Sequence, residues 1–102
     1  MSAIKVNKAN FEEIKNSEKV VLLDFYADWC GPCRMVGPVI EEIAEERADI
    51  VVGKVNVDEE DELAGQFGVF SIPTLVVMKG GKIVSQESGA KPKVQILAML
   101  EK

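Results

Sequence analysis

Residues 20–33 read Val20-Val21-Leu22-Leu23-Asp24-Phe25-Tyr26-Ala27-Asp28-Trp29-Cys30-Gly31-Pro32-Cys33, and this stretch decides the fold. Residues 20–27 are apolar or aromatic on both alternating faces, with one aspartate among them, which is typical of a central strand covered on two sides. Gly31-Pro32 then breaks the strand and favours a helix start, because the first turn of a helix tolerates proline. We therefore expect Cys30 just before a helix and Cys33 within its first turn.

The rest of the chain alternates between strand and helix patterns. Beyond Cys33, apolar residues recur at helical spacing opposite a glutamate-rich face, and they are Met35, Val36, Val39, Ile40, Ile43 and Ala44. Further strands are expected at residues 4–6, 50–57, 74–78 and 83–87, with a hairpin turn at Gly80-Gly81. Further helices are expected at the Asn10–Glu13 capping box, from the Asp58 cap to Gly68, and from Pro92 to Leu100.

This order of elements, β-α-β-α-β-α-β-β-α, predicts the topology. Strand–helix–strand units with short loops make parallel strand pairs with right-handed crossovers, whereas the last two strands form an antiparallel hairpin. The sequence therefore predicts an α/β fold with a mixed sheet and helices on both of its faces. A chain of 102 residues suffices for one domain, spanning residues 1–102, and is too short for two.

Composition and charge exclude several classes of function. The chain has 17 acidic and 12 basic residues, for a net charge of −5, and no run of Lys or Arg that would favour nucleic-acid binding. Its longest apolar stretches are about eight residues, far short of a membrane span. The first residues carry no secretory pattern, so we expect a soluble, cytoplasmic protein.

The two cysteines are the residues best suited to chemistry. They are three positions apart, so a disulfide between them closes almost no loop and would stabilise the fold little. At the start of a helix, partial positive charge and free N–H groups stabilise a thiolate, which is the attacking species in disulfide exchange. Cys30, before the helix, should be exposed and attack a substrate disulfide. Cys33 should be more buried and release the substrate by attacking Cys30.

Two other functions are compatible with this pattern. Structural zinc needs four ligands, and one chain offers two sulfurs and no histidine, although a dimer could pool four thiolates around zinc or an iron–sulfur cluster. Alternatively, the same fold could serve as a subunit or clamp of a larger assembly, independent of its redox state. The placement of the Cys-x-x-Cys motif between a strand and a helix favours redox chemistry over both.

Asp24, Lys54 and Pro73 are further candidates. Asp24 interrupts an apolar strand, and a buried, unpaired carboxylate is costly. This cost points to a proton acceptor and donor for Cys33, unless Asp24 lies at the edge of the sheet or faces water at a strand end. Lys54 interrupts the next strand and could pair with Asp24, although an outward-facing lysine is the simpler interpretation. Pro73 precedes a strand, and only about 5–6% of X-Pro bonds in folded proteins are cis.

Together these residues resemble the thioredoxin family, and the match covers nearly the whole chain. The motifs that carry the resemblance are Asp24-Phe25-Tyr26-Ala27, Trp29-Cys30-Gly31-Pro32-Cys33, Pro38, Lys54-Val55-Asn56-Val57-Asp58, Ile72-Pro73-Thr74, Gly81 and Gly89-Ala90. The resemblance implies the thioredoxin fold, a five-stranded mixed sheet flanked by four helices. It also implies a thiol–disulfide oxidoreductase, a protein-disulfide reductase that carries electrons and maintains cell redox homeostasis through mixed disulfides with its substrates.

The resemblance further implies partners and residue roles. The protein would be a monomer with no bound cofactor or metal, holding electrons in its redox-active cysteine pair and receiving them from a flavin- and NADPH-dependent or a ferredoxin-linked thioredoxin reductase. Cys30 would be the nucleophile and Cys33 the resolving thiol. Asp24 would be the buried acid–base group, tuned by Lys54, and Pro73 would be cis and would face the cysteines. The apolar surface that docks disulfide-containing proteins would comprise Trp29, Gly31, Pro32, Ile72, Pro73, Gly89 and Ala90.

Four positions depart from the commoner pattern of the family. Tyr26 stands where many bacterial members carry a second tryptophan, and Phe70 stands shortly before Pro73, where other residue types are common. Arg34 replaces the commoner lysine and keeps its charge, and Gly37 occupies a place often held by alanine. We expect none of the four to touch the chemistry, whereas Tyr26 and Phe70 leave the choice of partner open.

Overall fold

A computed structural model, which describes residues 2–102, shows one five-stranded sheet with the strand order β1-β3-β2-β4-β5. The strands are β1 (Ile4–Lys5), β2 (Val20–Tyr26), β3 (Ile50–Asn56), β4 (Thr74–Lys79) and β5 (Lys82–Ser88). The helices are α1 (Lys8–Lys15), α2 (Gly31–Glu46), α3 (Asp61–Gln66) and α4 (Lys93–Met99). Strand β3 pairs in parallel with β1 and β2, whereas β4 is antiparallel to β2 and β5. The predicted α/β fold, a mixed sheet with four helices, is confirmed.

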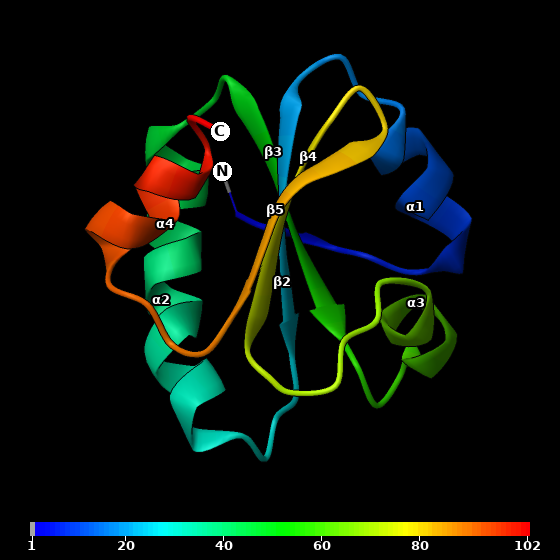
Figure 1. Cartoon of the computed structure of the whole chain (residues 1–102), viewed down its shortest axis with the longest axis vertical. Coiled ribbons are helices and arrows are strands. Elements are labelled where there is room, and N and C mark those ends of the chain that lie inside the picture. Colours follow the sequence, from blue (N-terminus) through cyan, green and yellow to red (C-terminus); the bar gives the residue numbers. More distant parts are fainter. Residues whose placement is uncertain (1) are drawn as a thin grey trace.

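The sheet separates two apolar layers (Figure 1). Helices α2 and α4 cover one face, and α1 and α3 cover the other. Side chains alternate between the faces along β2: Leu22 packs in one cluster with Ile40 and Ile96, whereas Leu23 packs in the opposite cluster with Phe11 and Leu63. This double burial is the physical reason for the nearly unbroken apolar run of residues 20–27.

The position of β2 in the middle of the sheet determines where Asp24 lies. Asp24 is two residues beyond Leu22 and therefore shares its face of the sheet, beneath α2 and α4. Its register partner in β3 is Lys54, and its partner in β4 is Leu75. A strand-end aspartate facing water is thereby excluded.

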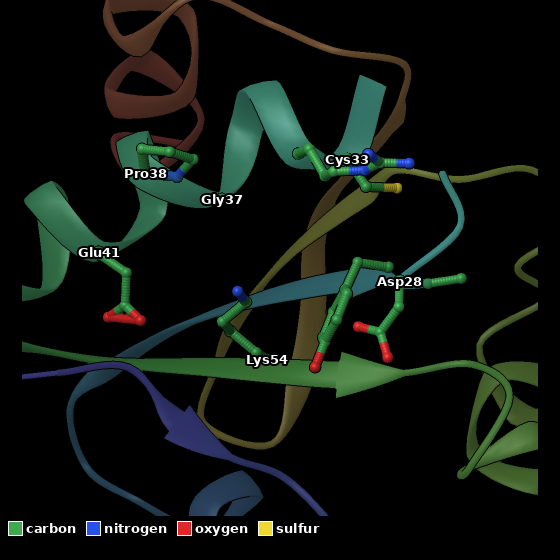
Figure 2. Close-up of a pocket in the computed structure, with 9 residues that line it drawn as sticks. Asp28, Cys33, Gly37, Pro38, Glu41 and Lys54 are labelled. Atoms are coloured by element: carbon green, nitrogen blue, oxygen red, sulfur yellow. The ribbon is translucent and has the colours of Figure 1, made fainter. Parts of the chain in front are cut away.

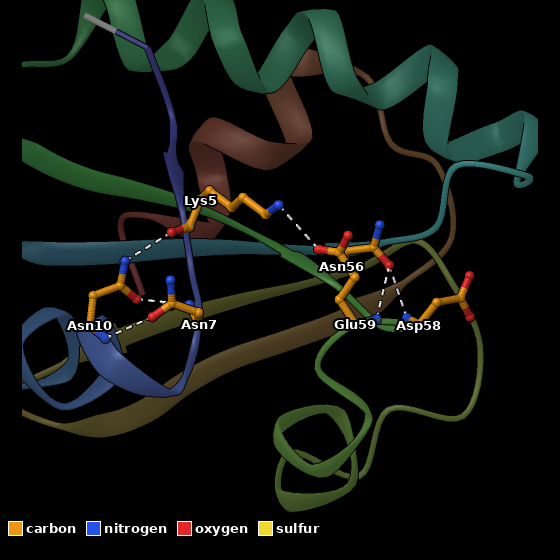
Figure 3. A network of polar contacts seen from close by, with 6 residues as sticks. All are labelled: Lys5, Asn7, Asn10, Asn56, Asp58 and Glu59. Atoms are coloured by element: carbon orange, nitrogen blue, oxygen red, sulfur yellow. Dashed lines mark hydrogen bonds and ion pairs between the residues drawn. The ribbon is translucent and has the colours of Figure 1, made fainter.

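Two predicted helix starts are wrong, and both errors concern local hydrogen bonds. Helix α1 begins earlier than expected, because Asn7 and Asn10 form the capping box, each side chain accepting the other's backbone N–H. Helix α3 begins after Glu60 with no side-chain cap, so Asp58 does not cap it. The Asn56 side chain instead closes the preceding turn by accepting the N–H of Asp58 (Figure 3).

The β4–β5 hairpin has the expected two-residue turn. Gly80 and Gly81 have φ values of 60° and 79°, and such left-handed conformations at both central positions suit glycine. Within residues 2–102, no helix is both long and apolar enough to cross a membrane.

Candidate active site

The two cysteines lie where β2 gives way to α2, as the sequence predicts. Cys30 is the N-cap residue of α2, and its Sγ accepts the backbone N–H of Cys33 at 3.2 Å. Pro32 occupies the first turn of the helix, where its missing N–H costs no hydrogen bond. The two sulfurs are joined in a disulfide, with the Cα atoms 5.3 Å apart. A hydrogen bond from the first turn to this sulfur would also stabilise a thiolate there.

The expected difference in exposure between the two cysteines is wrong. Cys30 is 5% exposed and Cys33 is 4% exposed. Both pack with Ala27 in a small apolar cluster, against which Ile72 is also packed. The reason is tertiary packing, because Ala27 and Ile72 lie against both cysteines. In the oxidised protein, exposure therefore does not assign the roles.

The two cysteines nevertheless face different surroundings. The Sγ of Cys30 lies 3.9 Å from the carbonyl oxygen of Ile72, in the loop that precedes β4. Cys33 instead lines a cleft of about 430 Å³ between α2 and the sheet, together with Gly37, Glu41 and Lys54. Figure 2 shows Lys54 rising from β3 toward α2, with Cys33 at one end of the cleft and Glu41 at the other.

The residues expected to dock substrates surround the Ile72 side of the disulfide. The Ile72–Pro73 bond is cis, and the carbonyl oxygen of Pro73 accepts the N–H of Gly89 at 2.8 Å. This hydrogen bond holds the loop at Gly89 beside the loop that carries Ile72. Of the expected set, the exposed residues are Trp29, Gly31, Pro32, Gly89 and Ala90, whereas Ile72 is half-buried and Pro73 is buried.

Trp29 is held in place by a polar contact that the sequence did not predict. Its side chain is 67% exposed, and its indole N–H donates to Oδ2 of Asp58 at 2.8 Å. Asp58 is itself positioned by the Asn56 turn, and Lys5 of β1 bridges to the neighbouring Glu59 at 3.2 Å (Figure 3). The end of β3 thus orients the aromatic ring beside Cys30.

Asp24 is a buried carboxyl group without a hydrogen-bond partner. It is 1% exposed, and within residues 2–102 neither carboxylate oxygen accepts a hydrogen bond. Burial raises the pKa of Asp24 to about 6, and the positive charge of Lys54 opposes that rise. An acid with such a pKa exchanges its proton near neutral pH, as a general acid–base group must.

Lys54 lies opposite Asp24 in the register but makes no ion pair with it in the described part of the chain. Its ammonium group lies over the ring of Tyr26 instead, with Nζ 4.6 Å from the ring centroid. The interpretation of Lys54 as a purely outward-facing lysine is wrong, because the side chain is half-buried and lines the cleft.

Comparison with known proteins identifies the family. The sequence model described as Thioredoxin matches residues 2–102. The chain is 50% identical to a thioredoxin of Alicyclobacillus acidocaldarius subsp. acidocaldarius, over 97% of this chain and 95% of the relative. It is 45% identical to the thioredoxin of Bacillus subtilis (strain 168), over 100% of this chain and 98% of the relative. The chain belongs to the thioredoxin family.

A solved structure agrees with this family. A single-residue mutant of thioredoxin from Halobacterium salinarum superimposes with a TM-score of 0.90 at 38% identity, covering 98% of this chain and 88% of that one. The present chain is a thiol–disulfide oxidoreductase that reduces protein disulfides. Its Cys30–Cys33 pair carries the electrons without a bound cofactor, and a reductase is its partner. Among residues 2–102, no group of three or more His, Cys, Asp or Glu side chains could hold a metal ion.

Two exposed side chains lie where the sequence analysis misplaced them or left their position open. Met35 is 73% exposed, so its predicted place in the apolar face of α2 is wrong. Val36 and Ile40 occupy the buried face of α2. Met35 lies about 100° around the helix from Val36, outside this buried face. Phe70 is 98% exposed and lies two residues before Ile72. Its unusual residue type was the signal that the sequence offered at this position.

Proposed function

We propose that this thioredoxin reduces disulfides in two steps, with Cys30 as the nucleophile and Cys33 as the resolving thiol. The Cys30 thiolate attacks one sulfur of the substrate disulfide, which forms a mixed disulfide and releases the first substrate thiolate. Cys33 then loses its proton and attacks the sulfur of Cys30, which releases the second substrate thiolate and leaves the Cys30–Cys33 disulfide. Two electrons pass to the substrate, whose two thiolates take up protons from water. The N-cap position of Cys30, whose sulfur accepts the N–H of Cys33, is the observation that carries this assignment.

Asp24 is the group that takes the proton of Cys33 in this proposal. It lies on the face of the sheet that α2 covers, and its raised pKa of about 6 leaves it ionised but still basic near neutral pH. Lys54 tunes it, because a nearby positive charge favours the carboxylate. A carboxylate that accepted hydrogen bonds would be a weaker base, so the lack of hydrogen bonds to Asp24 supports the role.

The docking surface in this proposal comprises Trp29, Gly31, Pro32, Ile72, Pro73, Gly89 and Ala90, and we add Phe70 to it. Phe70→Ser should lower kcat/KM for a protein disulfide about tenfold, because partial burial of a phenylalanine contributes about 1–1.5 kcal/mol. The rate with a small aromatic disulfide should not change, since that reagent is too small to reach Phe70. Stopped-flow measurements with both substrates provide the comparison.

Ile83→Ser is a matched control for this prediction. Ile83 is also exposed, but it lies in β5 beside the Gly80-Gly81 turn, at the end of the sheet away from the cysteines (Figure 1). Its kcat/KM with the protein disulfide should stay at the parent value. Equal losses in the Phe70 and Ile83 variants would remove Phe70 from the docking surface.

We also propose that the electron donor is a thioredoxin reductase, either flavin- and NADPH-dependent or ferredoxin-linked. One of the two systems should sustain reduction of insulin disulfides by catalytic amounts of this protein, measured as turbidity from the released chains. Turnover with dithiothreitol but with neither reductase would contradict the assignment of the donor and leave that of the cysteines intact.

We further propose a cytoplasmic monomer with one domain over residues 1–102, as in the family it resembles. Analytical ultracentrifugation tests whether the protein is a monomer.

A further inference from the structure

The position of the Lys54 ammonium group is unexpected for a charge beside a buried acid. Asp24 is its register partner and has two oxygens without a hydrogen-bond partner. Opposite charges on neighbouring strands ordinarily pair. Here Nζ lies over the ring of Tyr26, 4.6 Å from the centroid, and no ion pair joins Lys54 to Asp24 within residues 2–102.

The strand geometry gives Lys54 two alternative sites. Asp24 and Tyr26 are two residues apart in β2, so their side chains leave the same face of the sheet. Lys54 lies directly across from Asp24 on the parallel strand β3, and its side chain shares that face. A flexible four-carbon stem can therefore place the ammonium group on either the carboxylate or the ring.

The other charged groups around the cleft do not explain the observed position. From α2, Cys33, Arg34 and Glu41 line the cleft, and Asp28 lines it from the β2–α2 loop. Glu41 is engaged elsewhere, because its Oε1 accepts the backbone N–H of Ala3 at 2.7 Å. Asp28 is exposed to solvent, so water screens its attraction for Lys54.

Gly37 of α2 faces the Lys54 ammonium group. A Cβ atom built on Gly37 would lie 3.7 Å from Nζ of Lys54, which is its nearest contact. The wall of the cleft is therefore backbone rather than side chain where it faces the charge.

Tyr26 itself stays neutral while Asp24 titrates. Burial, and after it the negative charge of the nearby Asp28, raise the pKa of Tyr26 above the ordinary value.

We propose that Tyr26 is a positioning residue whose ring holds the Lys54 ammonium group away from Asp24 and so keeps the buried carboxyl group basic. The face of an aromatic ring attracts a cation within about 6 Å of its centroid. An ammonium group that moved onto Asp24 would favour its carboxylate form and make it a weaker proton acceptor. The consequence for catalysis rests on the proposed role of Asp24, whereas the placement of the charge does not.

The direct test is the pKa of Asp24 in the oxidised protein, measured by NMR titration of its carboxyl carbon. Tyr26→Leu removes the ring and should lower this pKa by about half a unit or more, since Lys54 is then free to pair with Asp24. Tyr26→Phe keeps the ring without the hydroxyl group and should leave the pKa unchanged. Tyr26→Trp should not lower it, because indole binds cations at least as well; this variant also guards against a Leu variant that does not fold.

Lys54→Met shows whether the effect passes through the lysine. In this background, Tyr26→Leu should no longer lower the pKa of Asp24. A fall of the same size without Lys54 would overturn the proposal, because the ring would then act directly on Asp24. An unchanged or raised pKa in Tyr26→Leu with Lys54 present would overturn it as well, as would an equal fall in Tyr26→Phe.

A second measurement separates this proposal from the role of Asp24. The rate at which Cys33 resolves a preformed mixed disulfide should depend on pH, and Tyr26→Leu should shift that profile to lower pH by the change in the pKa of Asp24. A shifted NMR pKa with an unshifted rate profile would retain the positioning of Lys54 and reject Asp24 as the base. An unshifted NMR pKa would reject the positioning whatever the rates show.

Discussion

Replacing Cys33 with serine should convert this thioredoxin into a protein that attacks substrates but does not release them. The Cys30 thiolate still forms the mixed disulfide, and no second thiol remains to resolve it. Steady-state reduction of a protein disulfide should fall at least about a thousandfold, because the removed group is a reacting atom. Incubation with oxidised substrate, followed by non-reducing electrophoresis and intact mass, should show a one-to-one covalent complex.

Cys30→Ser is the matched control for this trap. It removes the sulfur that lies by Ile72 and leaves Cys33, which lines the cleft. No mixed disulfide should accumulate with this variant, although its steady-state activity is equally low. Because both cysteines are buried in the oxidised protein, this pair of variants tests the roles more directly than exposure does. Trapping of equal extent by both variants would contradict the assignment of Cys30 as the nucleophile.

Asp24→Ala should increase the stability of the protein above pH 6 while it slows catalysis. The folded pKa of about 6 lies above the ordinary value of 3.8. Below about pH 3, Asp24 is largely protonated in both the folded and the unfolded state, so ionisation costs the fold almost nothing. Between the two values the unfolded chain ionises first and the fold loses stability, and above the folded pKa the loss is complete, at about 3 kcal/mol.

The alanine variant lacks this loss and carries only the cost of a small cavity, of about 1 kcal/mol. It should therefore exceed the parent in free energy of unfolding by about 2 kcal/mol at pH 8, and fall slightly below it at about pH 3. Urea denaturation of the oxidised proteins at both pH values measures the difference. Glu45→Gln, on the exposed face of α2, should change stability by less than about 0.5 kcal/mol at either pH.

The catalytic half of the prediction uses the same variant. Asp24→Ala should slow resolution of the mixed disulfide by about 100-fold or more near neutral pH, because Cys33 loses its proton acceptor. The first step, attack by Cys30, should be affected much less, and stopped-flow kinetics separates the two steps. A variant that is destabilised at both pH values and resolves mixed disulfides at the parent rate would make Asp24 an ordinary structural residue.

The sequence by itself determined the elements and the place of the chemistry. The apolar run of β2, the Gly31-Pro32 break and the helical spacing in α2 are local patterns, so they predict the strand–helix junction that holds Cys30. The order of strands and helices likewise predicts a mixed sheet, because short connections allow few topologies. Local cues were weaker at the helix starts. The errors at Asn10 and Asp58 arose because several nearby polar side chains could satisfy the same N–H groups.

Only the tertiary structure decided which distant residues meet around that junction. Asp24 and Lys54 are neighbours because β2 pairs in parallel with β3, and Asp58 receives the indole N–H of Trp29 because the end of β3 lies beside the β2–α2 loop. The position of Lys54 over Tyr26, and the burial of Cys30, also follow from packing. These contacts join residues far apart in the chain, and their geometry depends on strand register and on the surfaces that α2 covers. A local pattern records which residues are apolar, but it does not record which of them become neighbours when the whole core is packed.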